Sequence, residues 1–314
     1  MELNKNFWER LSKIYSPTEI KVIKKGFSTK KRNVSFRINT LKSADENEVL
    51  KVLDEKGLKY TKIDFLQNAY ILNDATLKDL WDLDIFKDGK IYLQSIASQI
   101  PVNFLDLKSG DKVLDITASP GSKTSQIGSI LQNTGEITAN DNNAIRIDKL
   151  KFTLERQGVT NTKVIKNDAT KLGEILEENS FDKILADLPC SAEGRINLNN
   201  EKSYGFWSES NIKKNYLIQR DILKNTIKLL KVGGILVYST CTIAPEENEG
   251  IVHFILSNFK ELEIEDISLD YKYIKNGITR FGDIIYNKKV DKSLRCLPSE
   301  ETEGFFVVKF RKII

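Results

Sequence analysis

The larger, C-terminal part of the chain repeats short apolar runs and longer amphipathic segments. From about Lys108, runs typical of buried strands alternate with segments whose apolar residues recur at helical spacing. This order of strand, loop and helix predicts a parallel sheet with helices on both faces. Ligands of such sheets bind at the carboxyl ends of the strands, so the loops that follow the strands form the predicted site. The strand candidates are 112–116, 136–140, 163–167, 183–187 and 235–240.

The first 95 residues follow a less regular pattern. Apolar residues recur at helical spacing in 7–14 and 49–53, whereas 35–41 alternates like a strand. We therefore expect two domains, a small α+β domain over residues 1–95 and a larger α/β domain over residues 96–314. Residues 304–310 predict a closing strand, for which an antiparallel direction is favoured.

The composition is that of a soluble globular protein. The 314 residues are 40% hydrophobic and 29% charged, which disfavours disordered and fibrous classes. No apolar run approaches the roughly 18 residues that a membrane span needs. The N-terminus lacks the apolar core and the cleavage site of a signal peptide. We therefore expect a cytoplasmic protein that does not bind a membrane.

Metal-binding side chains are scarce. The chain has three cysteines, Cys190, Cys241 and Cys296, and one histidine, His253. These residues are too few and too scattered for a disulfide framework or a zinc cluster. We expect no metal site and no Ser-His-Asp triad.

Basic residues are concentrated in one segment. The net charge is only +4, but residues 21–44 contain eight lysines and arginines and no acidic residue. Phe27 and Phe36 lie among these charges, a combination typical of surfaces that bind phosphates and stack on unpaired bases. A solvated lysine-rich face would explain the same charges without any ligand. The basic residues are Lys21, Lys24, Lys25, Lys30, Lys31, Arg32, Arg37 and Lys42.

A loop of mostly small residues follows the first strand of the repeat. Small side chains allow backbone N–H groups to approach a ligand at a helix N-terminus. Positions 117 and 122 are not the glycines that a Walker motif requires, and the GxGxxG pattern of NAD-binding proteins is missing. A nucleoside triphosphatase and an NAD site are therefore disfavoured. The loop consists of Thr117, Ala118, Ser119, Pro120, Gly121, Ser122 and Lys123.

Acidic residues close the next three strands. Asp141 lies about 20 residues beyond Gly121, where nucleotide-binding sheets place an acid that binds ribose hydroxyls. Asp168 and Asp187 follow at the ends of the third and fourth strands. Each acid alone is typical of a helix cap or a turn. Together they indicate one ligand of the adenosine type with a polar, neutral or cationic head.

Two cysteines fall at the same edge of the predicted sheet. Cys190 follows one strand in the sequence DLPC, and Cys241 follows another in STC. A lone cysteine is most often a small buried hydrophobe, and we assign that structural role to Cys296. Carbon 5 of a pyrimidine becomes nucleophilic only after addition to carbon 6, so its methylation needs a thiolate. The residue types at this edge meet that requirement. His253 receives no catalytic role.

The sequence blocks together resemble one family. The chain is similar to the S-adenosylmethionine-dependent RNA cytosine-5 methyltransferases of the Sun/Fmu (RsmB-type) and nucleolar Nop/Sun group. The combination of DLPC with YSTCT and PEENE is highly specific. The shared blocks are SFRINTLK, VLDITASPGSKTSQ, AND followed by Arg146, NDAT, ADLPCSAEGR, Trp207, KVGGILVYSTCTIAPEENE and RCLPSEETEGFF.

The resemblance implies a fold, a cofactor and a reaction. The fold is Rossmann-like, with a mostly parallel seven-stranded sheet, and the cofactor is S-adenosylmethionine. Residues 1–95 recognise RNA, either tRNA or rRNA, and residues 96–314 carry out the catalysis. The reaction methylates carbon 5 of a cytosine through a covalent bond between a cysteine and carbon 6.

The resemblance also implies residues that bind the cofactor. The loop 117–123 holds the methionine end, Asp141 the ribose and Asp168 the adenine edge, and Arg146 belongs to the same site. Thr117 and Ser119 depart from the residues that are usual in this loop.

Four residues match the catalytic positions of the family. Cys241 matches the nucleophile, and Cys190 matches the second cysteine, which assists release of the methylated product. Asp187 lies between the cofactor and the cytosine, and Lys123 lies near the target base. Ala192 replaces the glycine that usually follows the block DLPCS.

Three competing functions remain open at this point. The first is a DNA methyltransferase, which uses the same cofactor, but its Glu-Asn-Val segment and large recognition insert are not evident here. Since DNA enzymes attack with the Pro-Cys cysteine, only the family match assigns the attack to Cys241 rather than Cys190. The second is a binding module without turnover, and the third is a small-molecule methyltransferase. The inferred architecture needs no partner subunit, so we expect a monomer.

Overall fold

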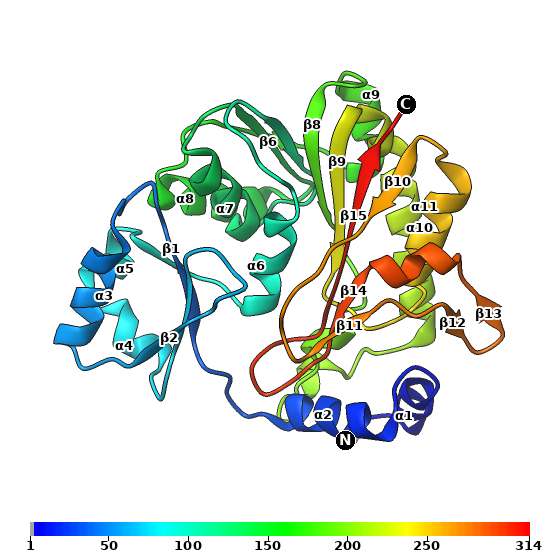
Figure 1. Ribbon diagram of the computed structural model, residues 1–314, viewed down its shortest axis with the longest axis horizontal. Coiled ribbons are helices and arrows are strands. Elements are labelled where there is room, and N and C mark those ends of the chain that lie inside the picture. The colour runs from blue at the N-terminus through cyan, green and yellow to red at the C-terminus, as the bar shows by residue number, and fades with distance from the viewer. Residues whose placement is uncertain (1–2) are drawn as a thin grey trace.

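The larger part of the molecule is built on one nine-stranded sheet (Figure 1). The computed structural model describes residues 3–314. Five neighbouring strands run parallel in the order β7-β6-β5-β8-β9. They are β5 (Lys112–Asp115), β6 (Glu136–Asp141), β7 (Thr162–Lys166), β8 (Phe181–Asp187) and β9 (Leu230–Thr240). The predicted repeat of strands and helices is therefore confirmed.

Four antiparallel strands extend the sheet beyond β9. The predicted closing strand is β15 (Phe305–Lys312), which pairs antiparallel with β9. On its other edge β15 pairs with β10 (Leu262–Glu265) and with β14 (Leu294–Cys296). A further strand, β11 (Ile274–Asn276), pairs with β14. The strands β11 and β14 come in addition to the seven that the family resemblance implied. Two short strands, β12 (Arg280–Phe281) and β13 (Ile284–Ile285), form a separate hairpin.

Helices cover both faces of the sheet. One face packs against α6 (Ile96–Asn103), α7 (Ser122–Leu131) and α8 (Ala144–Gln157). The other face packs against α9 (Leu172–Ile175), α10 (Glu209–Thr226) and α11 (Glu249–Asn258). Successive strand residues alternate between the two cores, since Ile184 and Ala186 belong to one and Leu185 to the other. This alternation explains why the strands read as continuous apolar runs. No helix within residues 3–314 is long and apolar enough to cross a membrane.

A smaller antiparallel sheet lies beside α7 and α8 (Figure 1). Its strand order is β2-β3-β1-β4, with β1 (Ser35–Ile38), β2 (Tyr60–Lys62), β3 (Ala69–Leu72) and β4 (Ile91–Leu93). The helices α3 (Glu46–Glu55), α4 (Leu77–Trp81) and α5 (Asp84–Lys87) complete this α+β unit. The boundary predicted at residue 95 lies between β4 and α6, and the division into two domains stays a prediction.

The first two helices pack away from the small sheet. α1 (Lys5–Ser12) and α2 (Pro17–Ser28) lie below the large sheet in Figure 1. Phe7, Leu11 and Phe27 share a buried cluster with Ile196 and Leu297 of the larger part of the molecule. The packing is close, because a Cβ atom on Gly26 of α2 would lie 2.6 Å from the backbone nitrogen of Ser299.

The interpretation of the two phenylalanines as base-stacking groups is wrong. Phe27 and Phe36 are both 0% exposed, each in its own hydrophobic cluster. Arg37 is also buried, and its guanidinium donates to Gln94 Oε1 (3.0 Å) and Ser125 Oγ (2.6 Å). Arg37 therefore joins the small sheet to α7. Phe27 is buried by the packing of α2, and Phe36 and Arg37 are buried on opposite faces of β1. The count of charges along the chain does not reveal this packing.

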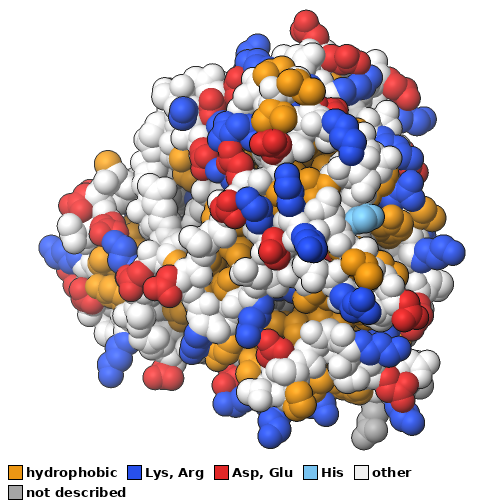
Figure 2. Space-filling model, turned by 45° about the vertical axis from the view of Figure 1, so that its right-hand side comes forward, with side chains coloured by type: hydrophobic (Ala, Val, Ile, Leu, Met, Phe, Trp, Pro, Cys, Tyr) orange, Lys and Arg blue, Asp and Glu red, His pale blue; other side chains and the backbone are white. Residues whose placement is uncertain are grey.

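The remaining charges do not form a patch of one sign on the face drawn in Figure 2. Basic and acidic side chains are interspersed there, with apolar groups between them. All lysines of the predicted basic segment are exposed. They are Lys21, Lys24, Lys25, Lys30, Lys31 and Lys42. Lys25 pairs with Glu300 at 2.6 Å, close to the last strand. The positive surface of this segment is therefore limited to these lysines and the half-buried Arg32.

Candidate active site

The loop after β5 has the backbone that its small residues allow. It runs from Thr117 to Gly121, contains a cis peptide between Ser119 and Pro120, and leads directly into α7. Gly121 has a φ of +102°, and a Cβ atom there would lie 3.1 Å from side-chain atoms of Leu150 and Thr153. The left-handed backbone favours glycine at this position, and the close side chains add to that preference.

This loop forms one wall of a cavity of about 430 Å³ at the carboxyl ends of β5, β8 and β9. The cavity brings together the loop, two of the predicted catalytic residues from β8 and α7, and the predicted nucleophile after β9. Its lining residues are Ser95, Ser98, Asp115, Thr117, Ala118, Ser119, Pro120, Ser122, Lys123, Asp187, Arg195, Cys241, Glu303 and Phe305.

Asp187 is the polar centre of the cavity. Its Oδ2 lies 2.6 Å from the ammonium of Lys123, and its Oδ1 accepts a hydrogen bond from Ser239 Oγ at 2.8 Å. Lys123 also donates to Ser98 Oγ at 3.0 Å. The Thr117 hydroxyl donates to the backbone carbonyl of Asp187 at 2.6 Å. The loop, α7 and β8 are thus joined at one carboxylate, whose orientation is fixed on both oxygens.

A second carboxyl group, that of Asp115, lies at the floor of the cavity. Asp115 is 1% exposed and accepts a hydrogen bond from Thr124 Oγ1 at 2.8 Å. Burial raises the pKa of Asp115 to about 7, although the Thr124 bond acts in the opposite direction. This side chain was not singled out from the sequence. The predicted strand ran to residue 116, which placed Asp115 inside it, whereas β5 ends at Asp115 itself.

The other two predicted acids follow neighbouring strands but do not line this cavity. Asp141 ends β6 and forms an ion pair with Arg146 at 3.1 Å, and Arg146 in turn donates to the carbonyl of Ser119 at 3.1 Å. Asp168 is exposed after β7, where it caps a short 3₁₀ helix by accepting from the Thr170 backbone at 2.9 Å. Asp141 and Arg146 therefore adjoin the outer side of the loop, and Asp168 lies one strand further along the edge.

The two cysteines at the strand ends are in contact. The sulfur atoms of Cys190 and Cys241 lie 3.3 Å apart, and neither residue forms a disulfide. Only Cys241 lines the cavity with Asp187 and Lys123. The hydrogen bond to Cys241, together with burial, raises the pKa of the Cys190 thiol well above its usual value. At neutral pH Cys190 is therefore a protonated thiol behind the sulfur of Cys241.

Buried carboxyl groups hold the two cysteine loops together. Glu247 accepts hydrogen bonds from the Ser191 backbone at 2.9 Å and from Gln219 Nε2 at 3.1 Å. The hydroxyls of Ser191 and Thr242 lie 2.7 Å apart, which connects the loop after β8 to the loop after β9. Burial raises the pKa of Glu247 to about 8. Burial likewise raises the pKa of Glu193, which accepts from Trp207 Nε1 at 2.7 Å, to about 7.

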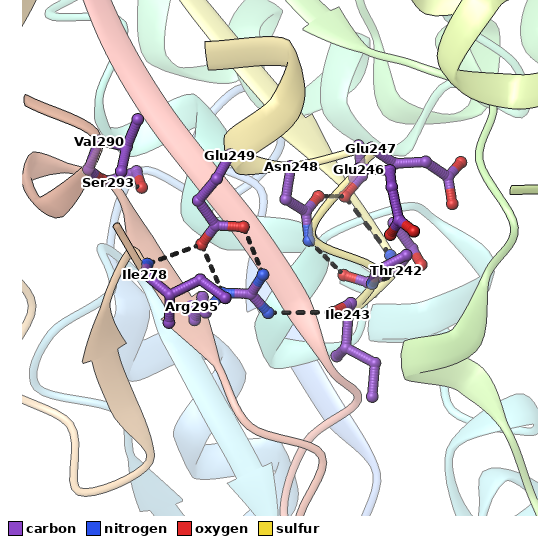
Figure 3. A network of polar contacts seen from close by, with 12 residues as sticks. Thr242, Ile243, Glu246, Glu247, Asn248, Glu249, Ile278, Val290, Ser293 and Arg295 are labelled. Carbon is purple, nitrogen blue, oxygen red and sulfur yellow. Dashed lines mark hydrogen bonds and ion pairs between the residues drawn. The ribbon is translucent and has the colours of Figure 1, made fainter. Parts of the chain in front are cut away.

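An ion pair anchors the next part of the same loop (Figure 3). Arg295 on β14 is 1% exposed and pairs with Glu249 of α11. Arg295 also donates to the carbonyl of Ile243 at 3.0 Å and to the hydroxyl of Tyr15 at 2.8 Å. Beside this pair, Asn248 accepts from Thr240 Oγ1 at 2.6 Å and donates to the carbonyl of Thr242 at 3.1 Å. The backbone on both sides of Cys241 is therefore fixed by buried polar contacts.

Several lining residues were missed by sequence reasoning. Ser98 comes from α6 and Arg195 from the 3₁₀ turn after Cys190. Glu303 lies in the loop before β15, and Phe305 is the first residue of that strand. Arg195 lies within the block ADLPCSAEGR and Glu303 within RCLPSEETEGFF, so membership of a shared block was the available signal. Their meeting depends on contacts between segments far apart in the chain, which periodicity does not show.

The remaining histidine and cysteine stand apart from the cavity lining. His253 Nδ1 accepts a hydrogen bond from the backbone of Asn287 at 2.9 Å, and Cys296 is buried in β14. Within residues 3–314, no group of three or more metal-ligating side chains is suitably placed to hold an ion.

A family comparison decides the assignment. A family model described as 16S rRNA methyltransferase RsmB/F matches residues 102–311, which is well over half of the chain. The chain belongs to this family. The resemblance to RNA cytosine-5 methyltransferases, drawn from the sequence blocks, is thereby confirmed.

Curated relatives of this family act on two kinds of RNA. The chain is 34% identical over 317 aligned residues to a tRNA (cytosine(49)-C(5))-methyltransferase of Pyrococcus abyssi, covering 99% of this chain and 97% of the relative. It is 32% identical over 283 residues to the ribosomal RNA small subunit methyltransferase F of Vibrio parahaemolyticus. That match covers 88% of this chain, which spans 56% of the relative's length.

A solved structure supports the fold and the cofactor. NSun6 from Pyrococcus horikoshii with SFG matches with a TM-score of 0.82 and 25% identity, over 99% of this chain and 98% of that one. The predicted Rossmann-like methyltransferase fold is confirmed. SFG is an analogue of S-adenosylmethionine, in agreement with the cofactor predicted from the sequence.

Proposed function

We propose that this RsmB/F-family chain methylates carbon 5 of a cytosine in RNA through a covalent bond from Cys241 to carbon 6. The observation that carries the proposal is the cavity itself. Cys241 faces the same space as the Lys123–Asp187 pair and the small-residue loop, with Cys190 3.3 Å from its sulfur. A nucleophile, a base-binding carboxylate and a cofactor loop thus meet in one place, as this chemistry requires.

The residues present fit S-adenosylmethionine. The glycine at +102° and the small side chains of 117–122 let backbone groups approach a ligand at the N-terminus of α7. We assign the methionine end to this loop, the ribose to Asp141 with Arg146 beside it, and the adenine edge to Asp168. Carboxylates also suit a cofactor with a positively charged sulfonium head. The bound cofactor supplies an electrophilic methyl group.

Cys241 begins the chemistry on the pyrimidine ring. Its thiolate forms a bond to carbon 6 of a cytosine flipped into the cavity, and the electron pair of the ring makes carbon 5 nucleophilic. Asp187, oriented by Lys123 and Ser239, holds the ring by accepting a hydrogen bond from its N4 amino group. The Lys123 ammonium beside it offsets the negative charge that develops near N3. Carbon 5 then takes up the methyl group.

Release restores the aromatic ring, the Cys241 thiolate and the Cys190 thiol. A carboxylate or a water molecule removes the proton from carbon 5, the pair of electrons returns to the ring, and the bond between sulfur and carbon 6 breaks. Cys190, a protonated thiol at neutral pH, assists the departure of the Cys241 thiolate from 3.3 Å away. These steps need neither a metal nor a second subunit, so we propose a monomeric enzyme.

We assign recognition of the RNA to residues 1–95. The exposed lysines of 21–42 offer charges for phosphates, and α2 packs against residues 298–299, close to Glu303 at the cavity. The relatives act on a tRNA and on a ribosomal RNA. We therefore propose one of these two classes as substrate.

Trapping with a fluorinated substrate tests the proposed function. Transcripts of tRNA and of 16S rRNA, prepared with 5-fluorocytidine in place of cytidine, are incubated with the protein and S-adenosylmethionine. Fluorine at carbon 5 cannot leave as a proton, so we expect an irreversible complex that carries one transferred methyl group. Cys241→Ala should form none. Failure of the unaltered protein to trap either transcript, with the cofactor bound, would overturn the proposal.

A further inference from the structure

The mouth of the cavity carries one exposed positive charge. Among the described residues, Lys123 and Arg195 are the cations that line the cavity. The Lys123 side chain is 11% exposed and is paired with Asp187, whereas the Arg195 side chain is 60% exposed. Arg195 is therefore the lining cation that a ligand meets on entering.

The backbone fixes Arg195 relative to the nucleophile. Gly194 donates its N–H to the carbonyl of Cys241 at 3.0 Å, and Gly304 donates to the carbonyl of Gly194 at 2.9 Å. The two glycines pack so tightly that a Cβ atom on Gly194 would lie 2.2 Å from the carbonyl oxygen of Gly304. Arg195 and Glu303, which flank these glycines, are consequently held at a set position beside Cys241.

The guanidinium of Arg195 forms an ion pair with Glu303. Its carboxylate lies 3.6 Å from Arg195 Nε and lines the same cavity. The negative charge of Glu303 raises the pKa of Arg195, although burial acts in the opposite direction. A partly exposed ion pair of this length is weak, because solvent screens both charges and 3.6 Å is too long for a hydrogen bond. A ligand with a stronger negative charge can displace the carboxylate.

We propose that Arg195 binds the backbone phosphate next to the target cytidine and that Glu303 competes with this phosphate for the guanidinium. The proposal rests on the proposed function, since a base that enters the cavity leaves its phosphates at the mouth. Arginine pairs with phosphate through two parallel hydrogen bonds, which the loose contact with Glu303 does not match. When the phosphate replaces Glu303 at Arg195, the nucleotide is positioned with its ring over Cys241.

Opposite substitutions in the pair test the proposal. The probe is a short fluorescent oligocytidylate, in which every base is a cytosine, and its binding is followed by anisotropy at several salt concentrations. The variants are Arg195→Gln, Glu303→Gln and the double variant. Lys228→Gln and Glu178→Gln are matched controls, because they remove the same charges from a partly exposed pair, 3.0 Å apart, that does not line the cavity.

The two single variants should act in opposite directions. Arg195→Gln should weaken binding roughly tenfold and reduce the slope of log K against log salt by about 0.7, the share of one phosphate contact on a single strand. Glu303→Gln should strengthen binding severalfold. The double variant should behave like Arg195→Gln, because the effect of Glu303 depends on the guanidinium.

The inference is overturned if Arg195→Gln weakens binding no more than Lys228→Gln, or if Glu303→Gln strengthens it no more than Glu178→Gln. The trapping experiment with 5-fluorocytidine separates this inference from the proposed function. If the unaltered protein traps the RNA but its binding does not depend on Arg195, only the proposed phosphate contact is rejected. If binding depends on Arg195 but no covalent complex is trapped, only the chemistry assigned to Cys241 is rejected.

Discussion

The sulfur of Cys241 lies 3.3 Å from the sulfur of Cys190, although 51 positions separate the two residues in the chain. Their separation exceeds the roughly 2.05 Å of a disulfide bond, so each retains its own thiol chemistry. Cys241 faces the cavity, and Cys190 lies behind it with a raised pKa. This arrangement agrees with the proposed roles, in which Cys241 attacks the ring and Cys190 assists release of the product.

Substitution of each cysteine should separate the two roles. Cys241→Ala should reduce methylation to background, because no group remains to activate carbon 5. Cys190→Ala should let the covalent protein–RNA complex accumulate with ordinary cytidine, because formation of the bond is retained and its cleavage is slowed. Denaturing gel electrophoresis with labelled RNA measures both outcomes. A complex that accumulates in Cys241→Ala instead would exchange the two assignments and make Cys190 the nucleophile.

Loss of the charge on Asp187 should slow the chemical step. Asp187→Asn keeps the shape of the side chain but removes the charged partner of Lys123, 2.6 Å away, and we expect kcat to fall about 10²-fold. Single-turnover methylation rates at saturating RNA measure this change. The control is Asp182→Asn, on the same strand, where the carboxylate pairs with Lys231 at 2.7 Å outside the cavity. Equal losses in both variants would assign Asp187 a purely structural role.

The free energy of unfolding should decrease as the pH rises from about 5 to 8. A carboxyl group whose pKa is higher in the folded chain binds a proton on folding, so it stabilises the fold at low pH and loses this effect as the pH passes the raised value. Glu247, with a pKa raised from 4.5 to about 8, should contribute up to about 1.4 kcal/mol per pH unit. Asp115 and Glu193 act in the same direction, up to about pH 7.

Glu247→Gln should therefore flatten the upper part of this pH profile. The amide stays neutral at every pH, so the decline between about pH 7 and 8 should be reduced, while the decline at lower pH should remain. Urea titrations across the range provide the measurement. An unchanged slope above pH 7 would show that Glu247 is not the group responsible. Glu178→Gln, at an exposed carboxylate, is the control and should leave the profile as it is.

Breaking the buried pair of Glu249 and Arg295 should destabilise the protein strongly. Arg295→Met leaves the carboxylate of Glu249 buried without its cation, and we expect the free energy of unfolding to fall by about 3–5 kcal/mol. The variant Arg295→Met with Glu249→Leu should recover part of this loss, because no buried charge remains. Chemical denaturation compares the two. A double variant no more stable than Arg295→Met would show that the hydrogen bonds to Tyr15 and Ile243 carry the effect instead.

The large sheet and the loop after β5 were predictable because both follow from local pattern. Continuous apolar runs indicate strands that are buried on two faces, and an acid at the end of a strand indicates the edge of the sheet where a ligand binds. Asp141, Asp168 and Asp187 accordingly lie where the sequence predicts them. The short strands β11 and β14 were not predictable, since three residues are too few for a period to appear.

The direction in which a side chain points was the part that the sequence did not determine. Phe27, Phe36 and Arg37 lie in a segment rich in lysine, yet all three are buried by helix and strand geometry. Arg195 and Glu303 were overlooked for the opposite reason. They belong to irregular segments, and only the tertiary packing of Gly194 on Gly304 brings them to the same cavity.

The contact between Tyr15 and Arg295 joins residues that are 280 positions apart. During synthesis the N-terminus emerges from the ribosome first. The apolar faces of α1 and α2 are therefore exposed long before residues 196 and 297, against which they pack, have been made. Contacts of such large sequence separation form late, since the intervening chain must first be ordered. The loop that bears Cys241 therefore receives its final support only after synthesis has passed residue 295.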